Sequence, residues 1–434
     1  MSNWDTAGLM AADKRYLWHP FTAMHDWCAP GHEPLVLVEG HGAILRDSRG
    51  QEYIDGNSSI WTNIHGHNHP RINAAIRGQL DLVAHTSFLG FTNPPAIELA
   101  RSIVELFPPN TLSRVFFSDD GSTGIEVALR IADQHWRWQG SERRRFIAFK
   151  DAYHGDTAGA ASLGAAAMFQ NGTNWNFPAI EVRSVVELEA LPAQEASEIA
   201  AVVIEPMVQG AAGIKLWPPG TLAAVRSWCD RAGVLLIADE VLTGFGRTGE
   251  MFACQHEGVM PDMMILAKGL TGGYLPLAIT LTTEQIFSMF CHRSCPENTL
   301  FYGHSYTGNA LACAAAKASL EIFDEEHVLV DLALKIETLR TELATVREMP
   351  QVVEVRQCGF IAGVEVRSNP ADAGPGKLGA AICLAARRHG LLTRPIRDVI
   401  VLMPPYCITP SQLQQAVRAL AAAIAEVGQK TVPA

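Results

Sequence analysis

The sequence predicts an α/β fold built on a mainly parallel, doubly wound sheet. Between residues 115 and 240, short apolar runs that suit buried strands alternate with segments of helical period. Two of the apolar runs, at residues 234–238 and 263–267, each end in one charged residue, Asp239 and Lys268. Because parallel strands present their carboxyl ends to a common crevice, we expect both side chains to meet there around one ligand.

The composition is that of a globular enzyme. The chain has 434 residues, of which 48% are hydrophobic and 18% charged, and its net charge is −11. This negative charge argues against nucleic acid as a partner, so small molecules are expected instead. The nine cysteines form no CxxC pair, the N-terminus has no secretory signal, and no apolar stretch approaches the ~18 residues of a membrane span. We therefore expect a cytoplasmic protein that makes no membrane contact.

The first predicted element is an N-terminal segment, residues 1–55. Residues 1–34 are aromatic, rich in proline and weakly periodic, which predicts an ordered arm. Residues 35–55 contain two short strand patterns with a turn at Asp47–Gly50, which is typical of a meander rather than of a parallel unit. We expect this segment to pack with a small C-terminal domain.

Residues 56–330 form the predicted large domain and residues 331–434 the predicted small α+β domain. The helix that precedes the strand at 234–238 begins after Pro218–Gly220 and ends at Gly233, a residue type common at helix ends because it adopts left-handed backbone angles. Strands are expected at 115–118, 146–149, 201–205, 234–238, 263–267, 352–355, 360–366 and 399–402, and helices at about 124–138, from 310, at 328–347, at 378–389 and from 411.

Asp239 and Lys268 suit one cofactor chemistry. Pyridoxal phosphate (PLP) is bound covalently by a lysine amine, and an aspartate opposite its pyridine nitrogen keeps that nitrogen protonated, so that the ring withdraws electrons. The alternative is that both residues are solvated strand ends. The spacing of the two residues does not distinguish these interpretations, so other segments must decide.

A candidate phosphate loop follows the strand at 115–118. The loop Asp119–Gly124 directly precedes a helix, whose free N–H groups and positive dipole end attract a phosphate. Gly121 permits close approach of the backbone, and Ser122 adds a hydroxyl group. The alternative interpretation is an ordinary helix N-cap.

Two residues at other strand ends are further candidates. Tyr153 follows the strand at 146–149, at the edge of the crevice, where its ring can lie flat on a planar cofactor. The alternative is a tyrosine of the core. Glu205 closes the strand at 201–205 and is a candidate carboxylate near the cofactor, without an assigned role.

Three other motifs suggest different functions and are weaker. His65, His67 and His69 resemble a metal cluster, but they lack helical spacing and a nearby carboxylate, so no metal is predicted. Gly244–Gly249 reads GxGxxG, but a dinucleotide fingerprint follows its strand at once and opens a helix, and this segment does neither. Gly303–Thr307 lacks the second glycine of the GxSxG elbow of serine hydrolases.

Together these segments resemble the class III, fold-type I PLP aminotransferases across almost the whole chain and in the motif order of that family. The resemblance implies that Lys268 binds the cofactor and moves a proton, and that Asp239 faces the pyridine nitrogen. It also implies a homodimer with shared active sites, in which Ser305 reaches the phosphate of the neighbouring subunit and Gly303 contributes to the substrate site. The segments that carry it are Ile237–Gly249, Leu266–Gly269 and Gly303–Asn309.

Within the class, the chain resembles the members that aminate 8-amino-7-oxononanoate in biotin biosynthesis. This resemblance implies that Arg394 binds the substrate carboxylate, which suits the bidentate donors of a guanidinium. It implies that Trp61 lines an aliphatic tunnel, with Phe21, Ile60 and Tyr406 also in the substrate site. The motifs that carry it are Leu17–Thr22, Ser58–Trp61, Tyr153–Asp156, Thr393–Pro395 and Met403–Tyr406.

Two positions bear on the amino donor. Members that use adenosylmethionine have a tyrosine where this chain has Phe21 and a tryptophan where it has Ile60. A second branch, with phenylalanine and a single tryptophan, uses lysine, so we favour lysine over adenosylmethionine. The segment Gly164–Glu198 looks shorter than in either branch, which keeps a general ω-amino-acid or diamine transaminase as the alternative.

Overall fold

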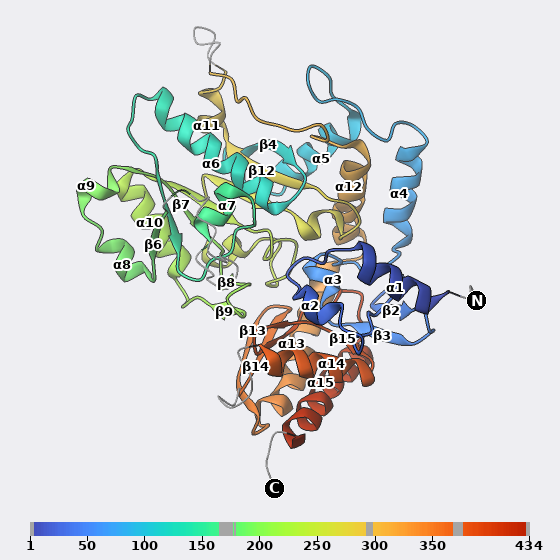
Figure 1. Cartoon of the computed structure of the whole chain (residues 1–434). Coiled ribbons are helices and arrows are strands. Elements are labelled where there is room, and N and C mark those ends of the chain that lie inside the picture. Colours follow the sequence, from blue (N-terminus) through green and yellow to red (C-terminus); the bar gives the residue numbers. More distant parts are fainter. Residues whose placement is uncertain (1–3, 165–176, 178, 292–297, 368–375, 431–434) are drawn as a thin grey trace.

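A seven-stranded sheet forms the centre of the molecule (Figure 1). The computed structural model describes residues 4–164, 177, 179–291, 298–367 and 376–430. Every neighbouring pair in the sheet is parallel except the two pairs that β12 makes, so the predicted mainly parallel α/β fold is confirmed. The strands in spatial order are β4 (Leu112–Ser118), β12 (Ala278–Thr283), β11 (Met263–Leu266), β10 (Leu235–Asp239), β7 (Ile199–Ile204), β5 (Arg145–Phe149) and β6 (Ile180–Val182).

Both faces of this sheet are covered by helices. Strands β7 and β10 are buried at every position, as expected for a sheet with two covered faces. Along β10 the side chains alternate: Ile237 packs with the apolar face of α6, and Leu236 packs in the cluster of α10 and α12. The helices of this domain are α4 (Pro70–Leu80), α5 (Pro94–Val104), α6 (Gly121–Trp138), α7 (Ala158–Leu163), α8 (Val185–Glu189), α9 (Ala193–Ala196), α10 (Thr221–Ala232), α11 (Glu284–Ser288) and α12 (Ala310–Glu325).

The antiparallel strand β12 was not predicted. It lies between β11 and β4, where the alternation of strands and helices in the sequence suggests only parallel neighbours. The chain reaches it through the short 3-10 turn η2 (Lys268–Thr271) and a loop, without an intervening α-helix. Its apolar residues were therefore not assigned to a strand.

The N-terminal meander joins the C-terminal part of the chain. Strands β1 (Leu37–His41), β2 (Ile44–Asp47) and β3 (Glu52–Asp55) are antiparallel as predicted, and β3 continues into a parallel pair with β15 (Leu391–Leu392). Figure 1 shows this blue meander beside the orange and red C-terminal elements. These elements are α13 (Val328–Arg347), β13 (Val352–Cys358), β14 (Ile361–Val366), α14 (Lys377–Arg388), β16 (Pro395–Ile396), β17 (Val399–Leu402) and α15 (Pro410–Lys430). The limits of the domains remain a prediction.

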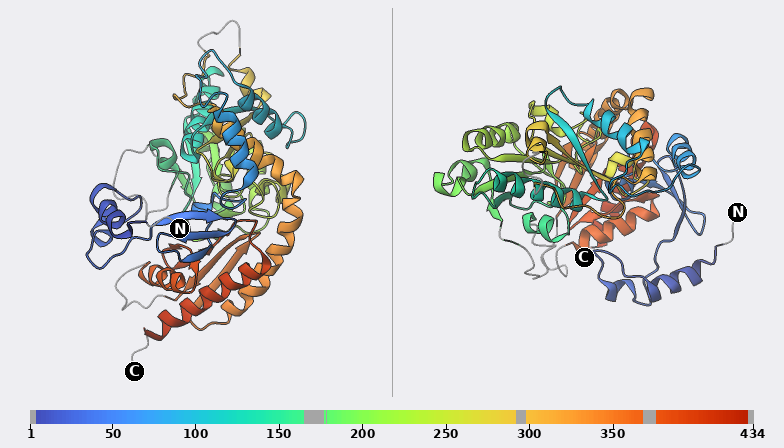
Figure 2. Two further views of the ribbon diagram at one scale, coloured as in Figure 1. Left: turned by 90° about the vertical axis from the view of Figure 1, so that its right-hand side faces the viewer. Right: turned by 90° about the horizontal axis from the view of Figure 1, so that it is seen from above.

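The N-terminal arm contains two helices that the weak periodicity did not predict, α1 (Thr6–Tyr16) and α2 (Met24–Trp27). Helix α1 has no buried residue, and Figure 2 shows it at the edge of the molecule. Lys14 donates to the carbonyl groups of Ala29 and His32, so the arm is held mainly by contacts within itself.

The remaining short elements are α3 (Ser58–Trp61), β8 (Val208–Gln209), β9 (Lys215–Leu216) and η1 (Ala253–Glu257). None of the helices in the described ranges combines the length and the apolar character that a bilayer crossing requires.

Candidate active site

A cavity of about 420 Å³ lies at the carboxyl ends of the central strands. This volume falls in the range typical of small-molecule sites. The cavity brings together eight of the predicted site residues from segments far apart in the sequence. They are Ile60, Trp61, Gly121, Ser122, Tyr153, Glu205, Asp239 and Lys268.

Lys268 reaches the cavity from the end of β11. Its backbone has a positive φ of 46°, a conformation that a residue with a side chain adopts only when its surroundings hold it there. Burial lowers the pKa of its amine, and the positive charge of Arg247 lowers it further, against the opposing charges of Asp239 and Glu205. An amine with a lowered pKa is neutral more often, which is the form that attacks a carbonyl group.

Asp239 ends β10 and is paired with a buried histidine. Its Oδ2 atom lies 2.6 Å from His154 Nδ1, and its Oδ1 accepts the backbone N–H of Val241 at 3.1 Å. Burial opposes the positive charge of His154, but the hydrogen bond to Asp239 and the charges of Asp239 and Glu205 outweigh burial and raise the pKa of the imidazole. The carboxylate is thus held in one orientation at the floor of the cavity.

The sequence reasoning missed His154 as a site residue, although it quoted the motif that contains it. The signal was present, because His154 follows β5, whose carboxyl end opens on the same crevice as β10.

Glu205 is a buried carboxyl group that lines the cavity. Its two oxygens accept the backbone N–H groups of Tyr153 at 3.1 Å and of Gly210 at 2.9 Å. Burial and the neighbouring charge of Asp239 raise its pKa to about 7, although His154 and the two backbone donors act in the opposite direction. Glu205 therefore joins the backbone at Tyr153 to the backbone at Gly210.

The candidate phosphate loop is built around the start of α6. Asp120 caps the helix by accepting the N–H of Thr123, so the N-cap interpretation holds for this residue, while Gly121 and Ser122 line the cavity. Ser122 Oγ accepts the N–H of Asp156 at 3.2 Å, and a Cβ atom at Gly155 would lie only 2.1 Å from the same oxygen. The candidate phosphate loop and the Tyr153 loop are therefore in direct contact.

Five predicted residues do not line this cavity: Phe21, Gly303, Ser305, Arg394 and Tyr406. Tyr406 is buried, and its hydroxyl donates to the carbonyl of Phe245 at 2.7 Å. Its ring also lies 5.0 Å from the guanidinium carbon of Arg247, so the structure places it in the core behind the site.

Arg394 and the other three residues lie farther out. Arg394 is partly buried, and burial lowers its pKa, with Cys383 and Tyr153 acting in the opposite direction. Within the described parts of the chain its guanidinium forms no ion pair, as suits a residue that binds a carboxylate of another molecule. Phe21 is 60% exposed, and the Gly303–Ser305 loop lies at the surface.

The rival motifs have other structural roles. His65 contacts Ser319, His67 contacts Asp55, and His69 lies 3.3 Å from Glu326, so the three rings point to different partners. Among the residues that the structure describes, no group of three or more His, Cys, Asp and Glu is arranged to hold a metal ion. Gly244–Gly249 forms consecutive turns and starts no helix, so it lacks the helix N-terminus that binds a dinucleotide.

Comparison with known proteins decides the family. The family model described as "Aminotransferase class-III" matches residues 27–424. The chain belongs to the class III aminotransferases. A class III relative from Nitratidesulfovibrio vulgaris, named adenosylmethionine-8-amino-7-oxononanoate aminotransferase, is 45% identical over 97% of this chain and 82% of its own length. A relative of the same name from Geobacter sulfurreducens is 44% identical over 95% of this chain and 96% of its own length.

Solved structures of an aminotransferase and of an omega transaminase have the same fold. The adenosylmethionine-8-amino-7-oxononanoate aminotransferase of Methanocaldococcus jannaschii matches with a TM-score of 0.93 and 38% identity, over 97% of this chain and 99% of that chain. An omega transaminase from Pseudomonas jessenii in complex with PMP matches with a TM-score of 0.91 and 29% identity, over 97% and 98% of the two chains.

The cofactor of class III aminotransferases is PLP, and the residues of this cavity fit it. A lysine amine, a carboxylate at a neighbouring strand end, a helix start with a glycine and a serine, and an aromatic ring all line one space. The GxGxxG rival offers none of these groups to the cavity.

Asp239→Asn tests the electrostatic role of this carboxylate. We expect the variant to retain the cofactor, because Lys268 and the phosphate loop are unchanged, and to lose at least about 10²–10³ in turnover, because a neutral amide cannot balance a pyridinium charge. Turnover is measured by steady-state kinetics and cofactor content by absorbance. Asp262→Asn is the matched control, since Asp262 lies at the opposite end of the same strands and pairs with Arg226. Near-normal turnover of Asp239→Asn would contradict the electrostatic role of this carboxylate.

The raised pKa of Glu205 predicts a pH-dependent stability. A carboxyl group whose pKa is raised on folding contributes stability that is fully present below its unfolded pKa and is lost as the pH rises through about 7. Between pH 5 and pH 8 the melting temperature of the cofactor-free wild type should therefore fall more than that of Glu205→Gln. Glu257→Gln is the control, because Glu257 also accepts two backbone N–H groups but is partly exposed. Parallel curves for wild type and Glu205→Gln would contradict this expectation.

Proposed function

We propose that this chain catalyses the PLP-dependent transamination of 8-amino-7-oxononanoate to 7,8-diaminononanoate in biotin biosynthesis. The observation that carries the proposal is the set of curated relatives that match nearly the whole chain at 36–45% identity and bear the name of this activity. The omega transaminases among the similar structures are 29–33% identical to this chain. A general ω-amino-acid or diamine transaminase is therefore the second candidate.

Each cavity residue has a proposed task in this reaction. Bound PLP supplies an electron sink that stabilises negative charge on the carbon beside the reacting nitrogen. Lys268 holds the cofactor through its Nζ atom. It then acts as general base and general acid, and transfers a proton from one carbon atom to another. Asp239, held by His154, keeps the pyridine nitrogen protonated. Tyr153 packs on the ring, and Gly121 and Ser122 bind the phosphate.

The substrate side of the proposal rests on the residues around the cavity. Trp61 and Ile60 line it and offer apolar surface to an aliphatic chain. Arg394 lies outside the cavity lining and is proposed to bind the substrate carboxylate. Phe21, Tyr406 and Gly303 keep their predicted place in the substrate site as proposals. The sequence suggested that the segment Gly164–Glu198 is shortened. Residues 165–176 and 178 of this segment lie outside the described residues.

Two observations bear on the amino donor and point in different directions. The names of the curated relatives specify adenosylmethionine. Phe21 lacks a hydroxyl group and Ile60 lacks an indole, and this loss of polar and aromatic partners for a sulfonium donor favours lysine. The proposed donor is one of these two amines.

A half-reaction titration tests both the substrate and the donor. The PLP form is mixed separately with diaminononanoate, lysine, adenosylmethionine and short ω-amino acids, and conversion to the pyridoxamine form is followed by absorbance. We expect diaminononanoate and one of the two donors to convert the enzyme. Conversion by short ω-amino acids without conversion by diaminononanoate would favour the second candidate. Conversion by adenosylmethionine but not lysine would show that the inference from Phe21 and Ile60 is wrong.

We also propose a homodimer with shared active sites. Two loops lie against each other at the surface, where His85 Nε2 is 2.7 Å from the carbonyl oxygen of Ser305. They and the neighbouring helix end carry exposed large apolar side chains, and a monomer seldom leaves such side chains together in water. They are Leu80, Leu82, Leu89, Phe91, Phe301 and Tyr306. If a second subunit packs on these side chains, Gly303 and Ser305 of the first subunit lie at the active site of the second.

Phe301→Asp tests the dimer. Phe301 is 76% exposed, so a charge there leaves the monomer fold intact and disrupts only an interface. We expect a shift from dimer to monomer in sedimentation velocity and weaker retention of PLP, since Ser305 would no longer reach a neighbour. Val330→Asp is the control, because Val330 is 69% exposed on α13. A dimeric Phe301→Asp protein with normal PLP retention is incompatible with this interface.

The cytoplasmic location remains a proposal from the sequence. The eight cysteines in the described residues are all free thiols, which suits a reducing compartment.

A further inference from the structure

The turn before Trp61 is strained. Ser58, Ser59 and Trp61 have φ values of 46°, 60° and 69°, in the left-handed region that favours glycine, yet all three carry side chains. Such a conformation costs free energy and persists only where its surroundings hold it. The contacts that hold this turn therefore show what it is for.

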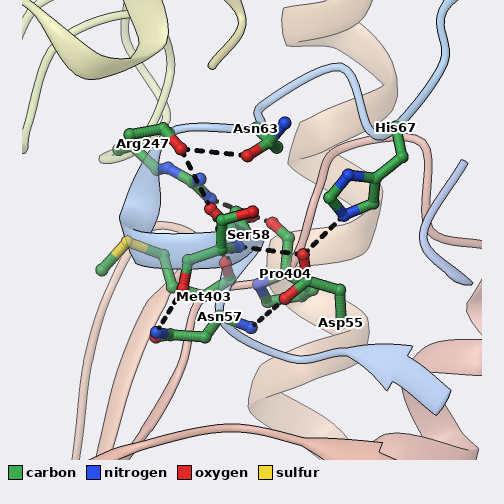
Figure 3. Close-up of polar contacts among 10 residues, drawn as sticks. Asp55, Asn57, Ser58, Asn63, His67, Arg247, Met403 and Pro404 are labelled. Carbon is green, nitrogen blue, oxygen red and sulfur yellow. Dashed lines mark hydrogen bonds and ion pairs between the residues drawn. The ribbon is translucent and has the colours of Figure 1, made fainter. Parts of the chain in front are cut away.

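Asp55 supplies two of these contacts. It ends β3 and is 2% exposed, and its carboxylate accepts the backbone N–H groups of Asn57 at 3.0 Å and Ser59 at 2.9 Å. His67 Nε2 lies 2.8 Å from the same carboxylate, and Figure 3 shows the two side chains facing each other. Bonds to an ionised acceptor are about twice as strong as neutral ones, so this carboxylate is well suited to stabilise the strained backbone.

The far side of the turn is fixed to the C-terminal part of the chain. Ser58 Oγ donates to the carbonyl of Met403 at 2.7 Å, and Arg247 Nη1 donates to the carbonyl of Pro404 at 2.9 Å (Figure 3). The turn is thus held from two directions, by Asp55 on one side and by this loop on the other.

The held turn places the indole of Trp61 beside the reacting amine. Trp61 Nε1 donates to Asn57 Oδ1 at 3.0 Å, and Lys268 Nζ lies 5.0 Å from the centre of the Trp61 ring. A Cβ atom at Gly210 would lie 3.3 Å from the same ring, so the Gly210 backbone lies close beside the indole. Movement of the turn would therefore shift the ring that covers Lys268.

We propose that Asp55 is a positioning residue of the aminotransferase: through the strained turn Asn57–Trp61 it fixes the Trp61 indole over the Lys268 amine. This inference rests on the proposed role of Lys268. Asp55 itself does not line the cavity, so its effect on the reaction is transmitted by Trp61.

The test compares Asp55→Asn with Asp47→Asn. Asp47 is a matched control: it is 5% exposed in the same sheet, its Oδ1 also accepts two backbone N–H groups, and its Oδ2 accepts the hydroxyl of Tyr53, but it lies outside the cavity lining. The first readout is acetylation of Lys268 in the cofactor-free protein, followed by mass spectrometry. We expect severalfold faster labelling in Asp55→Asn and no change in Asp47→Asn, because only the first variant uncovers the amine.

The second readout is a double-mutant cycle on transamination. Asp55→Asn should lower kcat about tenfold or more, as misplacement of an active-site group typically does. In the Trp61→Phe background the same substitution should change kcat by less than about twofold, because residues that act through one another are not additive. His67→Gln removes one contact of Asp55 and keeps both backbone bonds, so it should show a smaller change in the same direction and serves if Asp55→Asn does not fold.

The outcomes separate the inference from the proposed function. Unchanged Lys268 labelling in both Asp55→Asn and His67→Gln overturns the inference, and so do multiplicative effects in the cycle. A wild type without transaminase activity toward any amine, combined with the expected labelling change, overturns the proposed function, while the part of the inference that concerns geometry, that Asp55 fixes Trp61 over Lys268, stands.

Discussion

The buried pair of Asp239 and His154 is the interaction on which the rest of the site depends. Two carboxyl groups, Asp239 and Glu205, and one imidazole are removed from water at the edge of the sheet, which is costly unless each group is bonded. The bonds are supplied by the fold: β10 lies between β7 and β11, so Asp239, Glu205 and Lys268 end neighbouring strands. Any change that moves these strands relative to one another would expose or unpair a buried charge.

The residues proposed to hold the cofactor and the residues proposed to face the substrate come from different segments of the chain. The residues proposed to hold the cofactor, among them Lys268 and Ser122, come from the central sheet and the start of α6. The residues proposed to face the substrate, such as Trp61 and Arg394, come from segments outside the central sheet, α3 near the N-terminal meander and the loop between β15 and β16. One scaffold can therefore keep its cofactor chemistry while its flanking segments change the substrate.

Much of the central fold could be predicted because its signal is local. β7, β10 and β11 are continuous apolar runs, and each ends in a charged residue that could be named as a candidate. The antiparallel strand β12 was missed because no α-helix separates it from β11 in the sequence. The turn at Ser58–Trp61 was missed for another reason: its backbone angles depend on Asp55 and on residues far away in the sequence, and no local pattern encodes such contacts. The contact of Tyr406 with Arg247 has the same origin, since the two residues are far apart in the sequence.

The pairing of β3 with β15 has a consequence for folding during synthesis on the ribosome. Ser58 and its partner Met403 are 345 residues apart, and β3 must likewise wait for a strand near residue 391. At the usual rate of translation this wait lasts roughly 20–70 s. During that time the edge of the meander has no neighbour, so a nascent chain is open to unwanted strand pairing until the segment around residue 391 emerges. Chaperone capture during synthesis would therefore be most useful at strands β1–β3, which are synthesised long before β15.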